Sequence, residues 1–303
     1  MESLGGMKLF IKTIGSSLLI LPFVFYGIPH FLRPARTAET RSLFQGIVYQ
    51  RQIHASPRPF VTHLISVDLT APGVRAFVAP GTPTPDQTET TAYTVSEFLT
   101  QFDLQLAVNA SFFYPFTEKT PWNYYPHSGD RANVVGQAIS NGTEYSAAET
   151  NWVVLCFLDH QRAHIFNQAK CPNHTKQAVA GNRVLVANGK AVEIDQHSPD
   201  QVKPYARVAV AIDQSGQKLW LIVVDGKQRF YSQGVTLPEL AEIVIQLGAD
   251  AAINLDGGGS TTLALETAHG ATLLNAPIHT KIPMRERPVA NILGFYALPV
   301  RPE

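Results

Sequence analysis

The sequence has 303 residues, of which 45% are hydrophobic and 16% are charged, a balance typical of globular rather than disordered proteins. A chain of this length can bury the core of one large domain or of two small ones without disulfides or metal ions. Its 24 basic and 24 acidic side chains give a formal net charge of zero. This balance argues against a general nucleic-acid binder, which needs a basic excess to neutralise phosphates. An anionic ligand must therefore be bound by a local site.

The N-terminal segment, residues 1–33, differs from the rest of the chain. Lys8 and Lys12 precede the apolar run Ile14–Leu32, and Arg33 follows it. The run is long enough to span a membrane, and no clear small-residue cleavage site follows it. We therefore predict an uncleaved membrane anchor in preference to a cleaved signal peptide, with a buried core helix as the third alternative. With an anchor or a signal, the remaining chain lies outside the cytoplasm, in the periplasm or at the cell surface.

The remaining sequence divides into a stem and one domain. Residues 34–59 are polar and contain several prolines, which predicts a stem or linker. Residues 60–303 contain mostly short apolar runs and show no internal repeat. We predict an α+β fold, a single sheet-dominated domain with mixed β-sheets and a few packed helices. The pattern does not indicate an oligomeric state.

Alternating and capping residues mark the elements of the first half of the domain. Residues 61–69 and 74–80 alternate like half-buried strands. Residues 94–97, "TVSE", form a capping box that predicts a short amphipathic helix. Residues 104–114, "LQLAVNASFFY", indicate a buried strand that runs into a polar turn. Residues 115–135 form a long aromatic-rich loop, and such loops are usually functional or disordered.

Asn-Gly and Asp-Gly pairs occur between the apolar runs in the second half of the domain. They occur at residues 141–142, 188–189 and 225–226, and they predict turns between strands. The apolar runs 207–212 and 218–226, "RVAVAI" and "KLWLIVVDG", have the composition of paired central strands.

The best-marked helix begins after Thr236. Pro238 suits its first turn, Glu239 completes a capping box, and Gly248 ends it. Its apolar stripe predicts packing on a sheet, and a buried strand at residues 251–255, "AAINL", follows it.

Three consecutive glycines come directly after this strand. The strand period places Asn254 and Asp256 on one face and Leu255 toward the core. A glycine run lets backbone N–H groups converge on an oxygen ligand and leaves space for a substrate. The motif comprises Gly257, Gly258 and Gly259 followed by the hydroxyl residues Ser260, Thr261 and Thr262. A flexible hairpin turn is the alternative, whereas a nucleotide P-loop is not favoured because no Lys follows the glycines.

The segment "NLDGGGSTTL", residues 254–263, resembles the signature of the phosphodiester glycosidase family. Further similar segments occur in the family's order: residues 107–113, 206–212 with 221–226, and 286–296. Ser111 departs from the glycine that relatives commonly carry. The resemblance covers roughly residues 60–298. It implies an extracytoplasmic glycoside hydrolase that cleaves sugar-1-phosphodiester bonds, such as GlcNAc-1-phosphodiesters, in envelope polysaccharide or glycolipid. Bacterial members are described as exopolysaccharide-associated.

The proposed chemistry assigns roles to several residues. Asp256 is the leading carboxylate, as a base for water or as a stabiliser of the cationic sugar. Arg207, Arg287 and the amides of the glycine turn are candidates for stabilising phosphate. The other catalytic candidates are Asn109, for sugar hydroxyls or phosphate oxygens, and the reserve carboxylate Glu286. The other substrate-binding candidates are Asn254, Asp225, Gly257, Gly258, Gly259, Ser260, Thr261 and Phe113.

Two alternatives belong to other classes of protein. A non-catalytic glycan-binding envelope protein would use Trp122, Tyr124 and Tyr125 to stack on sugars, although these aromatic residues could equally cover the core. A metal-dependent phosphodiesterase would cut the P–O bond through Asp225, Asp256 and Glu286. The histidines show no metal-ligand spacing, so no cofactor is expected, and a divalent cation remains an open alternative.

The sequence contains two cysteines, Cys156 and Cys171. In an oxidising compartment their spacing permits a disulfide that closes a short loop, worth about 3 kcal/mol in the chain-entropy treatment. In the cytosol the same residues would be two buried thiols.

Overall fold

The computed structural model describes residue 24 and residues 27–158, 161–168, 170–194 and 198–300. Most of the predicted N-terminal anchor or signal lies outside the described residues. Within the described part of the chain, no helix is long and apolar enough to cross a membrane. The short helix α2 (Ile28–Phe31) precedes the first strand.

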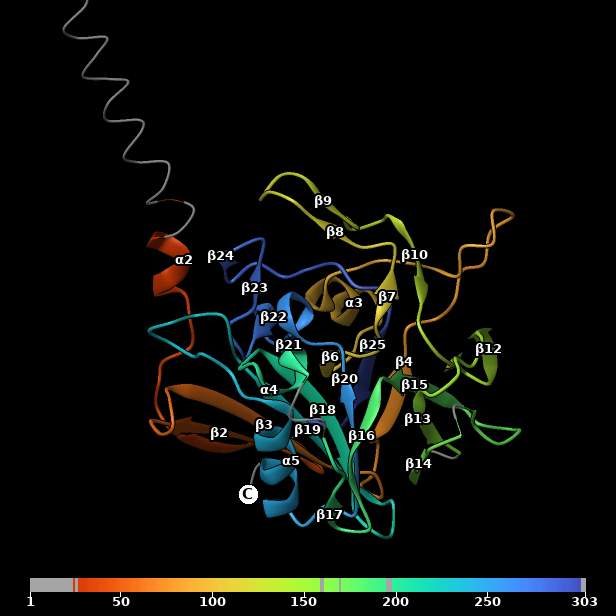
Figure 1. Ribbon diagram of the computed structural model, residues 1–303. Coiled ribbons are helices and arrows are strands. Elements are labelled where there is room, and N and C mark those ends of the chain that lie inside the picture. Colours follow the sequence, from red (N-terminus) through yellow and green to blue (C-terminus); the bar gives the residue numbers. More distant parts are fainter. Residues whose placement is uncertain (1–23, 25–26, 159–160, 169, 195–197, 301–303) are drawn as a thin grey trace, which may run out of the picture.

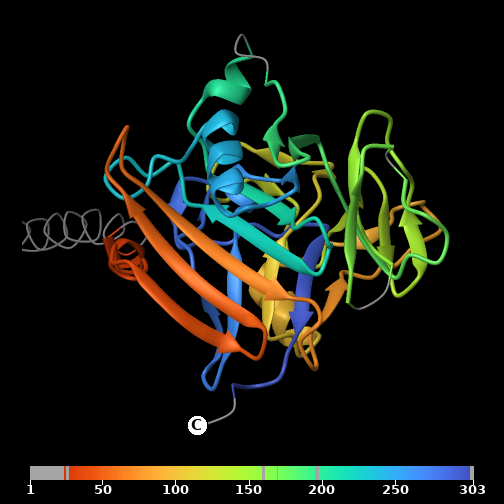
Figure 2. The ribbon, with the colours of Figure 1, turned by 90° about the horizontal axis from the view of Figure 1, so that it is seen from below.

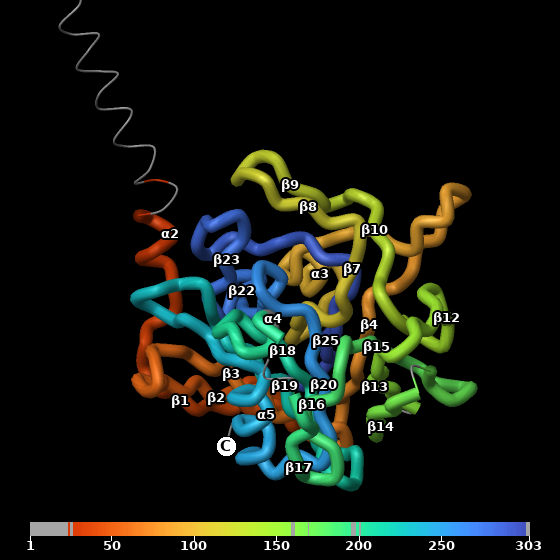
Figure 3. Tube along the Cα trace, viewed as in Figure 1, coloured from red at the N-terminus to blue at the C-terminus, as the bar shows by residue number. Residues whose placement is uncertain are grey.

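The largest sheet has eight strands drawn from both ends of the chain. Figure 3 shows β3 from the N-terminal part beside β19 and β18 from the C-terminal half. In spatial order the strands are β1 (Glu39–Phe44), β2 (Ile47–His54), β3 (Phe60–Asp68), β19 (Lys218–Val224), β18 (Arg207–Ile212), β20 (Ala251–Leu255), β16 (Arg183–Ala187) and β17 (Lys190–Ala191). The predicted pairing of residues 207–212 with 218–224 is confirmed.

The predicted stem, residues 34–59, supplies two strands of this sheet instead. β2 pairs with β3 over its whole length, and β1 pairs with β2. Ile47 and Tyr49 are fully buried, while the residues between and beside them face outward. The period-two alternation of β2 is therefore a strand signal, which the flanking polar and proline residues obscure in the sequence.

A five-stranded sheet faces the large sheet, and a second five-stranded sheet lies to one side (Figures 1 and 2). The facing sheet contains β22 (Gly270–Leu273), β21 (Leu263–Thr267), β6 (Leu106–Asn109), β25 (Ile292–Tyr296) and β4 (Arg75–Val78). The lateral sheet contains β12 (Thr143–Ser146), β11 (Ala138–Ser140), β15 (Gln177–Gly181), β13 (Val153–Phe157) and β14 (Ala163–Phe166). Smaller sheets pair β5 (Thr90–Thr91), β10 (Arg131–Val134) and β7 (Phe113–Tyr114), β23 (Ile278–His279) with β24 (Ile282–Pro283), and β8 (Thr117–Glu118) with β9 (Tyr124–Tyr125).

Every strand pair between described residues is antiparallel, so the predicted mixed sheets are corrected to antiparallel ones. Parallel strands need long crossover connections, usually helices. The described chain has few and short helices, and many of the strand pairs join strands that are consecutive in the chain.

Three apolar clusters hold these layers together. The central core lies between the large sheet and the facing sheet, with residues such as Ile65 and Val210 from one and Leu106 and Phe295 from the other. A second cluster packs α5 (Leu237–Gln246) on the outer face of the large sheet, as Figure 2 shows. A third packs α3 (Val95–Gln101) on the outer face of the facing sheet. The order of layers is therefore helix, sheet, sheet, helix.

The two predicted capping boxes are confirmed. Thr94 and Glu97 cap α3, and Thr236 and Glu239 cap α5, each with reciprocal side-chain to backbone hydrogen bonds. Gly248 follows α5 with φ +78°, a conformation that favours glycine. A further short helix, α4 (Pro199–Val202), lies before β18.

The glycine pairs divide into two classes. Residues 141–142 and 188–189 are hairpin turns, between β11 and β12 and between β16 and β17. All four residues have positive φ, as the hairpin turn of this type requires. Residues 225–226 follow β19 but form no hairpin with the next strand, β20, because α5 lies between them in the chain and β20 pairs with β18 instead.

Residues 115–135 fold as a hairpin followed by a strand, so the predicted loop is partly regular. The hairpin β8–β9 stands out from the body at the top of Figure 1, and its tip exposes Trp122. The hydroxyl of Tyr125 donates to the carbonyl of Arg131 and so ties the base of the hairpin to β10.

The predicted disulfide between Cys156 and Cys171 is present, and it closes a separation of 15 residues. Cys156 lies in β13 of the lateral sheet, and both cysteines belong to a small apolar cluster there.

Candidate active site

The glycine turn joins the two facing sheets. β20 of the large sheet ends at Leu255, and β21 of the facing sheet begins at Leu263. Between them, Gly258–Ser260 form one turn of 3-10 helix, η2. The turn therefore carries Asp256 to the place where both sheets end.

The glycines of this turn leave room for side chains from other segments of the protein to pack against its backbone. A Cβ at Gly259 would lie 2.3 Å from Nη2 of Arg287. Gly258 has φ +64°, and a Cβ there would lie 2.6 Å from the ring of Tyr205. Its N–H donates to the carbonyl oxygen of Ala206. The structure thus gives a different reason for these glycines from the predicted space for substrate, because protein groups fill that space.

A cavity of about 460 Å³ opens beside the turn. Aromatic residues before and within β7 form one side, and the ends of β16, β18 and β20 form another. Its lining residues are Phe112, Phe113, Phe116, Asn182, Arg183, Ser198, Gln201, Tyr205, Arg207, Leu237, Asn254, Leu255, Asp256, Gly257 and Arg287. Six predicted site residues are among them: Phe113, Arg207, Asn254, Asp256, Gly257 and Arg287.

Asp256 is the carboxylate that the cavity contains. Burial raises the pKa of Asp256 to about 6, although hydrogen bonds from Ser260 and Gly257 and the charge of Arg287 oppose this rise. At neutral pH the carboxylate form therefore predominates, yet the group retains appreciable basicity. Ser260 also accepts a hydrogen bond of 3.2 Å from Nη1 of Arg287, so it links the carboxylate to the guanidinium.

Arg287 is held by groups on several elements. Its Nη2 donates to the carboxylate of Glu118 on the β8–β9 hairpin, and its Nε lies 3.3 Å from Nδ1 of His279. The guanidinium also lies over the ring of Phe116, 4.4 Å from the centroid. A cation with this many contacts has a defined position, which suits a group that must stabilise charge without moving.

His279 is neutral at physiological pH. Burial and the neighbouring cations Arg287 and Arg285 lower the pKa of His279 to about 3. Its Nδ1 accepts from Arg287, so its contact of 3.6 Å with Glu118 is not a charge pair. Tyr124 packs edge-on against the imidazole at 4.6 Å between centroids.

Arg207 lines the cavity from the first position of β18. Its Nε donates to the carbonyl of Val235 and its Nη2 to the carbonyl of Lys203. It also lies over the ring of Tyr205, with 5.6 Å to the centroid. The backbone contacts hold its side chain beside the cavity.

Asn109 lies outside the cavity and is fully buried. Its Nδ2 donates to the carbonyl of Asp256 at 2.7 Å, and its Oδ1 accepts from the N–H of Thr262 at 3.0 Å. Both polar atoms therefore bind the backbone on either side of the glycine turn. Ser111, the departure from the family pattern, accepts from the N–H of Ala180 and so ties the segment after β6 to the lateral sheet.

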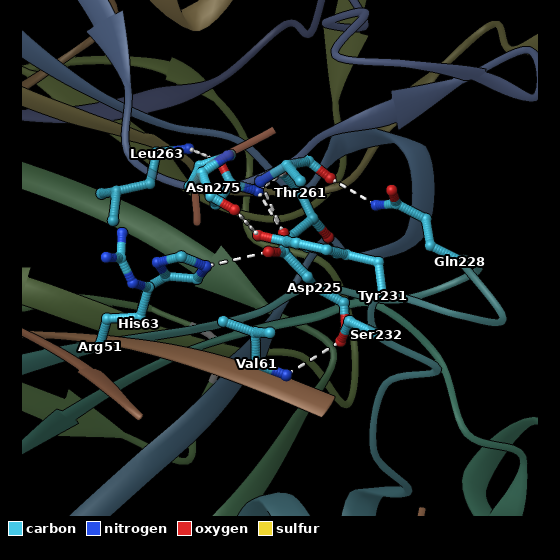
Figure 4. A network of polar contacts seen from close by, with 12 residues as sticks. Arg51, Val61, His63, Asp225, Gln228, Tyr231, Ser232, Thr261, Leu263 and Asn275 are labelled. Atoms are coloured by element: carbon cyan, nitrogen blue, oxygen red, sulfur yellow. Dashed lines mark hydrogen bonds and ion pairs between the residues drawn. The ribbon is translucent and has the colours of Figure 1, made fainter. Parts of the chain in front are cut away.

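Asp225 lies in a separate buried network, shown in Figure 4. Its Oδ2 is 2.9 Å from Nε2 of His63, whose Nδ1 is 2.9 Å from the hydroxyl of Tyr49. Its Oδ1 accepts from Nδ2 of Asn275 and from the N–H of Ala276. The carboxylate is thus fully used within the fold and does not line the cavity.

Glu286 also lies away from the cavity. It accepts from the N–H of Ser96 at 3.0 Å, in the first turn of α3, where a carboxylate favours the helix. Burial raises the pKa of Glu286, despite these hydrogen bonds. Asp225, Asp256 and Glu286 therefore do not converge, and the described residues contain no group of three His, Cys, Asp or Glu side chains that could hold a metal ion.

The remaining predicted residues divide between the cavity wall and its support. Asn254 lines the cavity, is 3% exposed, and donates from Nδ2 to Oδ1 of Asn182 at 2.9 Å. Ser260 and Thr261 are buried within the turn and are not among the cavity-lining residues. The aromatic residues Trp122 and Tyr124 are on the hairpin and are not among the cavity-lining residues.

Sequence reasoning missed several cavity residues. Arg183, Tyr205 and Phe116 line the cavity, and Glu118 binds Arg287 from behind it. No motif marks these residues. Arg183 alone carries a usable signal, because it opens a strand beside an Asn-Gly hairpin that pairs with β20.

Comparison with solved structures supports the fold. The chain shares 20% identity and a TM-score of 0.55 with the catalytic domain of zebrafish N-acetylglucosamine-1-phosphodiester alpha-N-acetylglucosaminidase, auto-inhibited by its pro-peptide, covering 90% of this chain and 93% of that one. A Synechocystis protein gives 16% identity and a TM-score of 0.55, covering 87% of this chain and 64% of the longer Synechocystis chain. A Burkholderia pseudomallei protein described as exported gives 16% identity and a TM-score of 0.54, covering 82% and 76%.

A search of curated proteins found no match to the chain. The family comparison is decisive, because residues 102–296 match the phosphodiester glycosidase family over more than half of the sequence. This range contains the glycine turn and all the cavity-lining residues. The chain belongs to the phosphodiester glycosidase family.

Proposed function

We propose that this protein is an extracytoplasmic hydrolase that cleaves glycosyl phosphodiesters in envelope polysaccharide or glycolipid. The observation that carries the proposal is the placement of Asp256 in the cavity wall, joined through Ser260 to Arg287. Family membership supports the reaction class. The zebrafish relative is named for N-acetylglucosamine-1-phosphodiesters, which makes such a diester the first substrate to test.

In this mechanism Asp256 acts as the base for water. With a pKa of about 6 it is ionised at neutral pH and can accept a proton from water as the oxygen bonds to the anomeric carbon. The bond between that carbon and the phosphate oxygen breaks, and a phosphate monoester leaves as an anion. The products are the free sugar and the monoester, and the phosphate itself requires little protonation to leave.

The cationic side chains of the cavity stabilise the leaving phosphate. Arg207 and Arg287 both line the cavity, and protein contacts hold each of them in place. Preoriented cations lower the energy of charge that develops in the transition state. Phe112, Phe113 and Phe116 provide an apolar wall that suits the face of a sugar ring.

Three observations support a location outside the cytoplasm. The disulfide between Cys156 and Cys171 is typical of proteins that fold in an oxidising compartment. The similar Burkholderia protein is described as exported. The apolar N-terminal sequence supports an anchored or secreted form.

The direct test incubates the purified protein with a GlcNAc-1-phosphodiester and with other glycosyl phosphodiesters. We expect release of the free sugar by the wild type and a loss of at least about 100-fold in kcat for Asp256→Asn, the scale of general-base catalysis. No turnover on a broad panel, or equal turnover by the variant, would contradict the proposal.

Hydrolysis in ¹⁸O-labelled water separates the two bond-cleavage chemistries. Label in the sugar supports cleavage at the anomeric carbon, and label in the phosphate selects the phosphodiesterase alternative. The glycan-binding alternative is selected by tight glycan binding that survives Asp256→Ala without product formation.

A further inference from the structure

The cavity contains an arginine, Arg183, whose Nε has no hydrogen-bond partner among the described residues. Arg183 stands at the first position of β16 and lines the cavity. Its Nε is buried and has no hydrogen-bond partner in the described part of the chain. Its guanidinium likewise makes no ion pair with any described carboxylate. A buried N–H donor without a partner is costly unless a ligand supplies the acceptor.

The two predicted arginines differ from Arg183 in this respect. Arg287 is bound to Glu118 and Ser260, and Arg207 is bound to backbone carbonyls. Their hydrogen-bonding capacity is partly used before any ligand arrives. Arg183 is therefore the cavity arginine with the most capacity left for an anion, and its planar fork matches two phosphate oxygens.

An unpartnered acceptor lies directly opposite this donor. Arg183 and Asn254 are paired residues of the antiparallel strands β16 and β20, so their side chains are cross-strand neighbours. Oδ1 of Asn254 is buried and has no partner in the described chain, because Nδ2 alone is bonded to Asn182. The site thus offers a cationic donor beside a neutral acceptor.

This combination indicates the chemistry of the ligand. An ionised carboxylate would use Arg183 but, as an acceptor only, would leave Oδ1 of Asn254 unsatisfied. A phosphate esterified to a sugar or another polyol supplies the anion and, next to it, a hydroxyl that donates to Oδ1.

The spacing along β20 relates this site to Asp256. Asn254, near the end of β20, and Asp256, just after it, are alternate residues that both line the cavity, and two residues of extended chain span roughly 7 Å. A phosphate bound at Arg183, beside Asn254, would therefore lie close enough to Asp256 for both side chains to contact the same glycosyl phosphate.

We infer that Arg183 binds the phosphate of the substrate and that Asn254 accepts a hydrogen bond from an adjacent hydroxyl of the esterified sugar or polyol. This inference rests on the proposed function and makes phosphate recognition depend on β16, outside the glycine motif. It makes Arg183 a specificity-determining residue for phosphodiesters.

The test compares the full-length wild type with Arg183→Met and Arg183→Lys, in detergent, on the diester that gives turnover. We expect Arg183→Met to raise KM about 10-fold or more with a smaller change in kcat, and to weaken competitive inhibition by inorganic phosphate similarly. Arg183→Lys keeps the charge but loses the fork, so it should lie between the two. Arg75→Met, at an exposed position on β4 outside the cavity, is the charge-matched control and should behave as wild type.

Two outcomes overturn the inference and are distinguishable from failure of the proposed function. If the wild type turns over the diester and both Arg183 variants keep its KM and its inhibition by phosphate, the inference fails while the function stands. If no diester is hydrolysed, the proposed function fails, and titration of each protein with inorganic phosphate then decides the anion site. Weaker phosphate binding by Arg183→Met supports the site, and equal binding overturns it. The lysine variant gives the same readouts if the methionine variant does not fold.

Discussion

Asn109, at the end of β6, and Asn275, just after β22, bind the glycine turn through the same pair of bonds, and these two strands flank β21. Asn109 on β6 donates to the carbonyl of Asp256 and accepts from Thr262. Asn275 donates to the carbonyl of Thr261 and accepts from the N–H of Leu263. The turn that carries the candidate base is therefore held at four backbone positions by two buried amides.

Replacing either asparagine should loosen the turn and destabilise the fold. Asn109→Ala and Asn275→Ala each leave buried backbone groups unsatisfied, a cost of about 1–3 kcal/mol per lost partner. Urea unfolding should show this loss, and activity should fall with it. Asn173→Ala, at an exposed position, should change neither. Wild-type stability in both buried variants would show that the amide contacts are energetically unimportant.

Asp256 should give the pH profile of activity its acidic limb. Because its pKa is raised to about 6, the carboxylate form is lost as pH falls through that value, and kcat/KM should fall with it. The profile is measured on a substrate whose own groups do not titrate there. A limb near pH 4 would contradict the raised pKa of Asp256.

The same burial should make Asp256→Asn a stabilising substitution at high pH. A carboxyl whose pKa is raised on folding favours the folded state least when it is ionised, so stability is lost as pH rises from its unfolded value of 3.8 through about 6. We expect Tm of the variant to exceed that of the wild type by about 2–4 °C at pH 8, equivalent to about 1 kcal/mol for a domain of this size. The difference should shrink below pH 4, where both states are protonated. A difference independent of pH would exclude this cause.

Gly259 should be required for the position of Arg287. Gly259→Ala would place its Cβ 2.3 Å from Nη2 of Arg287, so the guanidinium must move. Activity should fall by an order of magnitude or more, because a displaced cation stabilises the leaving group poorly. The control is Gly189→Ala, where φ is +70° and the surrounding space is open. This control should lower Tm through backbone strain and leave kcat/KM unchanged.

Glu118 should affect the pKa of Asp256 through Arg287. Glu118→Gln removes the negative partner of Arg287, so the field of the guanidinium at Asp256 strengthens and the pKa of Asp256 falls. The acidic limb of the pH profile should therefore move to lower pH. Glu149→Gln, at an exposed position, is the control and should leave the limb in place. An unmoved limb in Glu118→Gln would mean that Arg287 does not couple the two carboxylates.

Local sequence patterns determine much of the fold. The capping boxes at Thr94 and Thr236 and the two Asn-Gly hairpins depend on neighbours within a few residues, so short motifs predict them correctly. The period of β20 likewise predicts that Asn254 and Asp256 share a face, and both line the cavity. These features follow from backbone geometry and need no knowledge of distant segments.

Tertiary structure decides which polar residues share the cavity. The sequence offers Asp225, Glu286 and Asp256 alike as candidate carboxylates. In the fold, however, Asp225 binds His63 and Glu286 binds the first turn of α3, because segments far apart in the chain bring these partners together. Arg183 reaches the cavity because β16, which ends at Ala187, pairs with β20, which begins only at Ala251. The sequence by itself determined the family, the turn and its carboxylate. Long-range strand pairing and burial decided which side chains remain free to bind a ligand, since hydrogen-bonding capacity depends on every neighbour in the fold.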